Sequence, residues 1–268
     1  MKNNDKKQVL LITGASSGIG KAAAILFAEN GWKVYGVARK DFNIPNVTAV
    51  LGDVTKADDM KKVVEFVIKQ EGQLDLLINN AGFGISGASE FSSVDDIRKI
   101  FEVNFIGAVS LTQTVLPFMR KQGYGRIINT SSVASVVPIP YQSFYSATKS
   151  ALDTWAKALK IEVAPFNIKV SNVLPGDTKT EFTSRREKSK NDVDGVYAKK
   201  ETKSIAKMEK DEQNGMPPIA VAKVMYKLAY KKNPPATKTV GFGYKAITFL
   251  TKILPTRLML WIVKLLYN

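Results

Sequence analysis

The chain has 268 residues, of which 45% are hydrophobic and 24% charged, a balance that is typical of globular proteins and excludes wholesale disorder. It contains no cysteine and no histidine, which excludes disulfides, cysteine-ligated zinc and any catalytic scheme that needs an imidazole base. The net charge of +15 indicates either a polyanionic partner, such as nucleic acid, anionic lipid or a phosphorylated ligand, or simply a lysine-rich solvated surface.

Short runs rich in β-branched residues alternate along the chain with longer amphipathic runs, and the two patterns predict strands and helices respectively. Alternation over most of the chain predicts an α/β fold: a single-domain, Rossmann-type, doubly wound parallel sheet of about seven strands with helices on both faces. In chain order, the predicted elements are strand 9–13, helix 21–30, strand 32–38, strand 47–51, helix 57–70, strand 74–79, helix 94–122, strand 126–131, helix 143–163, strand 168–174, helix 217–231 and strand 237–242.

We expect residues 1–268 to form one dinucleotide-binding and catalytic domain, because no internal repeat or domain boundary interrupts the alternation. Residues 183–213 are rich in Lys, Glu, Asp and Ser, so we expect a substrate loop over about 177–216, either solvated or a loosely docked helical lid. No targeting segment or spanning helix is evident, since Lys252, Pro255 and Arg257 interrupt the apolar C-terminus; we therefore expect a cytoplasmic protein.

A glycine-rich turn follows the first predicted strand and leads directly into a helix. It reads Thr13-Gly14-Ala15-Ser16-Ser17-Gly18-Ile19-Gly20. Such a turn lets the backbone approach a pyrophosphate, which the free N–H groups of the helix N-terminus then hold. The alternative is a tight strand–helix turn that is glycine-rich for packing alone. Strand, turn and helix in this register favour a nucleotide site.

The end of the second strand bears on the choice between NADP and NAD. NAD-specific sites place an acid on the ribose 2′-hydroxyl there, whereas this chain has Arg39, with Asp41 two positions later. A guanidinium would pair with a 2′-phosphate, so we expect NADP(H) to be preferred over NAD(H). The alternative is that Arg39 is only a solvated residue at the strand end.

From about Gln8 to Phe182 the sequence resembles the short-chain dehydrogenase/reductase family, and the similarity is weaker from there to the end. The resemblance is to NADP-preferring members acting on steroid-, retinoid- or lipid-like carbonyls. The motifs that carry it occur in the family's order: Thr13-Gly14, Gly18-Ile19-Gly20, Asp53-Val54, Asn79-Asn80-Ala81-Gly82, Asn104, Ser132, Tyr145-Ser146-Ala147-Thr148-Lys149, Pro175-Gly176 and Thr180.

The resemblance implies four catalytic residues: Asn104, Ser132, Tyr145 and Lys149. Tyr145 and Lys149 are four residues apart on one predicted helix, so their side chains share a face. We expect the ammonium, together with an oxidised nicotinamide, to lower the pKa of the phenol so that Tyr145 can exchange a proton with the substrate. The family pattern assigns Ser132 to the substrate oxygen, with Ser131 as the alternative, and Asn104 to a water that relays protons to Lys149.

The resemblance also implies which residues bind the cofactor, most of them following predicted strands. Lys149 would hold the nicotinamide ribose, Asp53 and Val54 would meet the adenine, and Thr180 would reach the carboxamide. The full cofactor set is Gly14, Ser16, Ser17, Gly18, Ile19, Gly20, Arg39, Asp53, Val54, Asn80, Ala81, Gly82, Tyr145, Lys149, Pro175, Gly176, Thr178 and Thr180.

Three segments should line the expected substrate cleft: 83–91, 136–143 and the region after Thr180, and the second is almost entirely apolar. With Phe83 and Ile85 facing it, we expect an apolar carbonyl or secondary alcohol, contacted by Ser132, Val137, Ile139 and Tyr145. No metal is expected.

The C-terminal extension, about 244–268, is basic and amphipathic. From Val221 to Asn268 there are nine basic residues and no acid. This extension would lie on an anionic membrane, cover the substrate entrance or pack in a homo-oligomer, and the resemblance implies dimers or tetramers. No nucleic-acid motif accompanies the charge, so a nucleic-acid partner is not expected.

The sequence therefore predicts an oxidoreductase, a carbonyl reductase that transfers a hydride between NADP(H) and a carbonyl or secondary alcohol. The alternatives are an enzyme of the 3-oxoacyl reductase type and a non-catalytic dinucleotide sensor. An intact Tyr145 and Lys149 disfavours the sensor.

Overall fold

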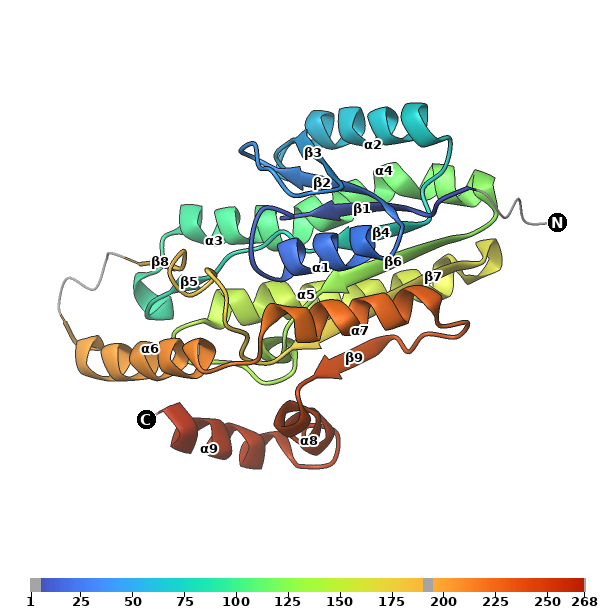
Figure 1. The fold of residues 1–268 in the computed structure, drawn as a ribbon. Coiled ribbons are helices and arrows are strands. Elements are labelled where there is room, and N and C mark those ends of the chain that lie inside the picture. The colour runs from blue at the N-terminus through green and yellow to red at the C-terminus, as the bar shows by residue number, and fades with distance from the viewer. Residues whose placement is uncertain (1–5, 190–194, 268) are drawn as a thin grey trace.

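A parallel sheet with strand order β3-β2-β1-β4-β6-β7-β9 runs through the centre of the part of the chain that the structure describes (Figure 1). The structure is a computed structural model, and it describes residues 6–189 and 195–267. The predicted α/β doubly wound sheet is confirmed. Its strands are β1 Val9–Thr13, β2 Lys33–Ala38, β3 Val47–Leu51, β4 Leu76–Asn79, β6 Gly125–Thr130, β7 Ile168–Pro175 and β9 Thr237–Val240.

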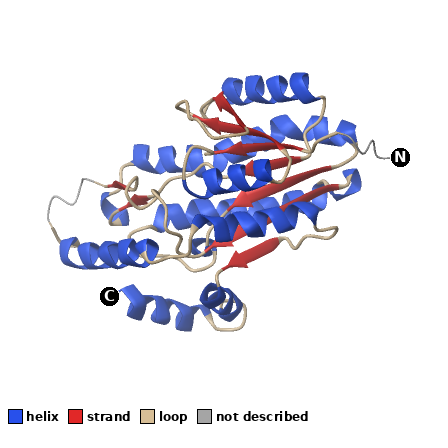
Figure 2. Ribbon diagram, in the orientation of Figure 1, coloured by secondary structure: helices blue, strands red, loops and turns tan. Residues whose placement is uncertain are grey.

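Helices cover both faces of this sheet (Figure 2). On one face, Phe27 and Met225 of two helices join a core cluster with strand residues. On the other, Val64, Leu111 and Leu159 come from three helices that pack on the opposite side. The first pair is α1 Gly18–Glu29 and α7 Pro218–Tyr230, and the second group is α2 Ala57–Glu71, α4 Gly107–Gln122 and α5 Ser143–Glu162.

The central strands are buried on both faces, which explains why they lack alternation of apolar and polar residues. Every residue of β1 and β4 is buried. β1 pairs in parallel with β2 on one side and β4 on the other. The strands from β1 to β3 are added towards one edge of the sheet, and those from β4 onwards towards the other edge. An open α/β sheet binds its ligand at the point between β1 and β4 where this order reverses.

The predicted helix over 94–122 is interrupted. It consists of α3 Val94–Phe101, a π-helical turn at Glu102–Ile106 and then α4. Within the described residues, Val94–Gln122 is also the one helical stretch long and apolar enough to cross a bilayer by length and composition alone. Leu111, Val115 and Met119 are fully buried against the sheet, so this stretch belongs to the core.

The region expected as a substrate loop contains a short second sheet and a helix. β5 Ile85–Ser86 pairs in parallel with β8 Glu187–Lys188, a pairing that the sequence did not predict. Part of the expected loop, 190–194, lies outside the described residues. Beyond it, α6 Ala198–Gln213 matches the helical-lid alternative.

The C-terminal extension forms two helices beyond the edge strand β9, α8 Phe242–Leu250 and α9 Thr256–Tyr267 (Figure 1). Few of their residues are buried: in α8 none is, and in α9 only Val263 is. The 3₁₀ turns Ser89–Phe91, Val133–Ser135 and Ala164–Phe166 complete the described elements.

Candidate active site

A cavity of about 620 Å³ opens at the carboxyl ends of the parallel strands. The ends of β1, β4, β6 and β7 contribute to its wall, as do the two C-terminal helices. An open α/β sheet places its ligands at this edge. Its lining joins the glycine-rich turn at Gly14, the predicted catalytic residue Tyr145 and the C-terminal residue Tyr267 in one cavity.

The glycine-rich turn has the backbone shape that a phosphate site requires. Gly14 and Gly18 have φ angles of 66° and 54°, which favour glycine. A Cβ on Gly20 would lie 2.1 Å from the carbonyl oxygen of Gly14, so this helix can approach the strand only without a side chain there. Ser17 caps α1 without a side-chain hydrogen bond, and the first turn has no acid. The free N–H groups and positive helix end therefore fit an anion.

Arg185, in a loop far away in the sequence, contacts the glycine-rich turn. The Arg185 guanidinium donates a hydrogen bond of 2.9 Å to Oγ of Ser17, across 168 sequence positions. Both residues line the cavity. This contact could not be predicted from the sequence, because no local pattern around an arginine in a polar loop indicates its partner.

Arg39 lies at the cavity wall directly after β2, where the sequence predicted a 2′-phosphate contact. The carboxylates of the two nearby acids accept hydrogen bonds from backbone N–H groups close by in the sequence. Asp41 accepts from Phe42 at 2.9 Å, and Asp53 accepts from Thr55 at 3.0 Å. Burial raises the pKa of Asp53, but the Thr55 hydrogen bonds and the charge of Arg39 outweigh it and lower that pKa overall. Both acids are therefore engaged in local hydrogen bonds.

On the side of the cavity where the adenine is expected, hydrogen bonds of Thr13 and Asn80 join the ends of neighbouring strands. The Thr13 hydroxyl accepts from the N–H groups of Asn80 and Ala81, each at 3.0 Å. The Asn80 amide donates to the Thr13 carbonyl at 3.0 Å and accepts from the Thr130 hydroxyl at 3.1 Å. These bonds join the ends of three neighbouring strands and fix the loop that lines the cavity.

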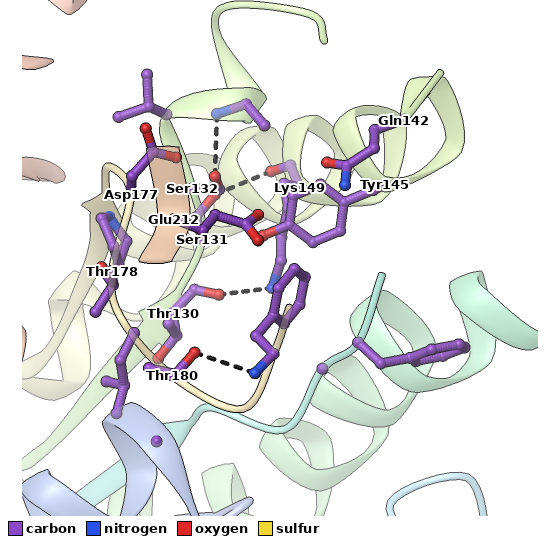
Figure 3. A pocket seen from close by; sticks show the side chains of 18 of the residues that line it. Thr130, Ser131, Ser132, Gln142, Tyr145, Lys149, Asp177, Thr178, Thr180 and Glu212 are labelled. Atoms are coloured by element: carbon purple, nitrogen blue, oxygen red, sulfur yellow. Dashed lines mark hydrogen bonds between the residues drawn. The ribbon is translucent and has the colours of Figure 1, made fainter. Parts of the chain in front are cut away.

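Tyr145 and Ser132 are brought together on the cavity wall (Figure 3). The Ser132 hydroxyl accepts from the N–H of Ala134 at 3.1 Å and hydrogen-bonds the Tyr145 phenol. Burial raises the pKa of Tyr145 to about 12, although the Ser132 hydrogen bond acts in the opposite direction. In this structure loss of hydration outweighs the nearby positive charge, and the expected effect of an oxidised nicotinamide on this pKa stays a prediction.

Lys149 lies one turn along α5 from Tyr145. Its ammonium is buried, donates a hydrogen bond of 2.8 Å to the Thr130 carbonyl and lies 5.7 Å from the centre of the Tyr145 ring. Burial lowers the pKa of Lys149 to about 8. A Cβ on Gly82 would come within 3.4 Å of the Lys149 Nζ, so the glycine leaves open the space above the ammonium. A ribose hydroxyl fits this donor and this opening.

The remaining predicted catalytic residue, Asn104, does not line the cavity. It is buried in the π-helical turn, where its amide accepts from the N–H of Phe83 at 3.0 Å and donates to the Phe83 carbonyl and the Thr148 hydroxyl. A Cβ on Gly82 would lie 3.1 Å from its Oδ1, which places this amide close to the Lys149 side. Its expected role in a water relay stays a prediction.

Ser131, the alternative to Ser132, is engaged elsewhere. Its hydroxyl donates to the backbone carbonyl of Lys149 at 3.2 Å and so ties β6 to the helix. Ser132 is the serine that contacts the phenol. The structure therefore favours Ser132 for the substrate oxygen.

A buried row of amides holds α5 against the sheet below the site. Asn79 donates to Asn129, Asn129 to Asn172, and Asn172 to the carboxylate of Asp153, each at 2.9 Å. Asp153 is one turn along α5 from Lys149. Because this ladder crosses three strands and ends on the helix, it fixes the helix that carries Tyr145 and Lys149.

The substrate side of the cavity is lined by both apolar and polar residues. Val137 and Ile139 line it as predicted, and so does Phe83. Ile85 does not, because β5 buries it in the small second sheet; that prediction is wrong. The C-terminal helices add eight apolar or aromatic residues to the wall, namely Tyr244, Ile247, Leu250, Met259, Ile262, Val263, Leu266 and Tyr267.

Three polar residues near Tyr145 were not among the predicted site residues: Gln142, Asp177 and Glu212, all on the cavity wall (Figure 3). Burial raises the pKa of both carboxyls, and their charges in turn raise the pKa of Tyr145. Asp177 accepts from the Tyr244 hydroxyl, and Glu212 accepts from the Thr183 hydroxyl at 2.6 Å and from the buried Arg186. These acids come from the end of β7 and the end of α6, which no local sequence pattern brings together.

Most of the predicted cofactor residues share this wall. Asp53 and Gly20 do not: Asp53 binds Thr55, and Gly20 packs inside the turn. The residues of that prediction that line the cavity are Gly14, Ser16, Ser17, Gly18, Ile19, Arg39, Val54, Asn80, Ala81, Gly82, Tyr145, Lys149, Pro175, Gly176, Thr178 and Thr180.

Comparison with known proteins identifies a family model and relatives that match this chain. Residues 8–191 match the family model described as short chain dehydrogenase. A 3-ketodihydrosphingosine reductase from Bacteroides thetaiotaomicron is 41% identical over 263 residues, which are 97% of this chain and 98% of the relative.

Two similar solved structures hold a nicotinamide cofactor. A 3-ketoacyl-(acyl-carrier-protein) reductase from Brucella melitensis complexed with NADH has a TM-score of 0.74 at 26% identity, over 87% of this chain and 96% of that one. ElxO with NADP bound has a TM-score of 0.75 at 27% identity, over 90% of this chain and 99% of that one.

Proposed function

The chain belongs to the short-chain dehydrogenase/reductase family, and from this premise we propose that it reduces the keto group of a long-chain, amphipathic lipid with NADPH. Family membership makes it an oxidoreductase acting on CH–OH or carbonyl groups with a nicotinamide cofactor. The choice of NADPH and of a lipid ketone is our proposal. The observation that carries it is one cavity whose wall holds Tyr145, Asp177 and Glu212 together with the apolar side chains of α8 and α9.

The roles of the chain's residues follow from their positions. A bound nicotinamide would supply the hydride. The phenol of Tyr145, protonated because burial raises its pKa, would donate its proton to the substrate oxygen. The Ser132 hydroxyl, adjacent to that phenol, would bind the same oxygen and stabilise the charge that develops on it. Lys149 would hold the ribose hydroxyls with its buried ammonium.

Arg39 supports NADPH. It is the basic side chain on the cavity wall at the end of β2, and the carboxylates of Asp41 and Asp53 are occupied by backbone N–H groups. A 2′-phosphate would gain a charge-assisted hydrogen bond from the guanidinium without facing an unpaired acid.

The mixed polar and apolar lining of the cavity supports a lipid with a polar head. The name of the relative denotes a long-chain amino alcohol with a keto group at carbon 3. An ammonium next to the reacting carbonyl would lie beside Asp177 and Glu212 and would favour the charged forms of these buried carboxyls. The alkyl chain would run along Ile247, Ile262 and Leu266.

NADPH oxidation with a graded set of ketones tests the proposal. We expect kcat/KM to rise with chain length, and 3-ketodihydrosphingosine to exceed a ketone of equal length without the amine. Tyr145→Phe should bind NADPH normally and lose turnover by about 10² to 10⁴-fold. Glu212→Gln should reduce the preference for the amine without changing the preference for chain length. A short, uncharged ketone as the best substrate would contradict the proposal.

A further inference from the structure

The outer surface of the two C-terminal helices is strongly apolar. Nine of the nineteen exposed large apolar side chains of the described residues lie between Phe242 and Leu266, a segment that is less than a tenth of the chain. Trp261 and Leu265 on α9 are 55% and 61% exposed, and Ile253 in the connecting turn is 59% exposed. Single exposed apolar residues are ordinary, but a contiguous group marks an interaction surface.

These side chains lie on the opposite side of α9 from the cavity. Met259, Val263 and Leu266 line the cavity, whereas Trp261 and Leu265 do not. The helix is therefore apolar on both sides, one side facing the substrate space and the other facing solvent. Among the residues that the structure describes, nothing covers Trp261 and Leu265, and such an exposed apolar face is typical of a surface that binds a partner.

The same segment is basic. The sequence has no acid after Glu212, and Lys245, Lys252, Arg257 and Lys264 are all exposed around the apolar side chains. Within the described residues, six ion pairs have a nitrogen–oxygen distance of 4.0 Å or less. None of them includes any of these four cations. Exposed apolar side chains ringed by lysine and arginine are the composition that binds an anionic lipid surface.

We propose that the outer face of α8 and α9 binds to the surface of an anionic bilayer, with Phe249, Ile253, Trp261 and Leu265 inserted at the level of the headgroups. A second copy of the chain fits this face less well, because a two-fold contact through it would bring each set of four cations against its equivalent without an acid between them. A bilayer containing anionic lipid offers apolar and negative partners together.

The position of this face gives the contact a consequence. α8 is tied to the site, since the Tyr244 hydroxyl donates to Asp177 and its ring packs on Gly176. The helices that would touch the bilayer thus also contribute residues such as Ile247 and Ile262 to the wall of the cavity. A lipid substrate would pass between them from the bilayer without crossing water; this part rests on the proposed function, whereas the docking rests on the surface alone.

Vesicle flotation of the full chain without substrate tests the docking. We expect flotation with vesicles of phosphatidylcholine and phosphatidylglycerol in a two-to-one ratio, little flotation with phosphatidylcholine alone, and loss at high salt. The W261S/L265S double variant should partition about tenfold less, since it removes two inserted side chains. Ile161→Ser, which removes a 78% exposed apolar side chain from α5, should float like the wild type.

Tryptophan fluorescence gives a second measurement on the unmodified chain. Trp32 is buried and Trp155 half-buried, so a blue shift on adding the anionic vesicles would report Trp261 and should be absent in Trp261→Ser. Absence of wild-type flotation, or equal flotation of W261S/L265S and wild type, overturns the proposal. The proposal is also overturned if the wild type does not float but forms a dimer in sedimentation velocity, and the W261S/L265S substitutions dissociate that dimer.

Activity on a short, water-soluble ketone separates this proposal from the proposed function. Trp261 and Leu265 do not line the cavity, so W261S/L265S should retain wild-type kcat/KM on that ketone and lose turnover on a long-chain ketone embedded in vesicles. Inactivity of the wild type on every ketone would refute the proposed function and leave the flotation result to decide the docking.

Discussion

Burial of the Lys149 ammonium should cost the folded protein stability at neutral pH and less at alkaline pH. Burial lowers its pKa from 10.5 to about 8, a difference that corresponds to roughly 3 kcal/mol. Lys149→Met removes this cost but also removes the 2.8 Å hydrogen bond to the Thr130 carbonyl, worth about 1.5–3 kcal/mol for a charged donor. The two effects nearly cancel at one pH, so the informative quantity is the pH dependence.

The sign follows from proton binding. Between the folded pKa of about 8 and the unfolded value of 10.5, the unfolded chain holds more protons on Lys149 than the folded chain does. The contribution of Lys149 to the free energy of unfolding therefore rises with pH across this window. The variant lacks this rise, so its stability relative to wild type should fall by roughly 2–3 kcal/mol between about pH 7 and about pH 10.

Urea unfolding of the wild type and of Lys149→Met at both pH values measures this change. The free energies of unfolding are subtracted between the two proteins at each pH and then between the two pH values, so that the titration of all other groups cancels. Lys62→Met is the matched control, because Lys62 is an exposed lysine of α2 and its ammonium keeps its hydration. Its stability relative to wild type should change little between the two pH values. A difference for Lys149→Met that is equally independent of pH would refute the argument that burial depresses this pKa.

Four further substitutions test other parts of the site. Arg39→Asp should raise the KM for NADPH roughly 10- to 100-fold more than that for NADH, and equal effects would refute the 2′-phosphate contact. Ser132→Ala should lower kcat by about 10²- to 10³-fold while the dissociation constant of NADPH, from fluorescence titration, stays unchanged. Gly20→Ala should lower the free energy of unfolding in urea by about 1–3 kcal/mol, because its Cβ would lie 2.1 Å from the Gly14 carbonyl oxygen. Arg185→Gln should weaken NADPH binding by about fivefold at low salt and less at high salt, whereas a salt-independent effect would speak against a phosphate contact.

The sequence was sufficient to predict the parts of the molecule that local patterns determine. The apolar run of β1 predicted a strand buried on both faces, and the glycines after it predicted the turn that the structure shows with positive φ at Gly14 and Gly18. The spacing of Tyr145 and Lys149 placed both on one side of α5, where they line the cavity together. In each case the cause lies within a few neighbouring residues.

The sequence was insufficient where segments far apart meet. Arg185 contacts Ser17, and Glu212 lies near Tyr145, through a loop and a helix whose packing no periodicity specifies. The small sheet that buries Ile85 depends on a pairing with β8, about a hundred residues later. The effect of burial on the pKa of Tyr145 was not evident from the sequence either, because loss of hydration, its largest cause, depends on how the whole site packs.

The raised pKa of Tyr145 bears on the reaction that this site favours. A phenol with a pKa of about 12 is protonated throughout the neutral range, so the chain begins each turnover with the proton that reduction of a carbonyl requires. Oxidation of an alcohol would require the phenolate, whose formation burial and the charges of Glu212 and Asp177 oppose. The same two carboxyls that would select an amino ketone therefore also keep Tyr145 in the form that reduces it. Replacing Glu212 by glutamine should lower both the preference for the amine and the pKa of the phenol, so selectivity and the alkaline limit of the pH profile should change together.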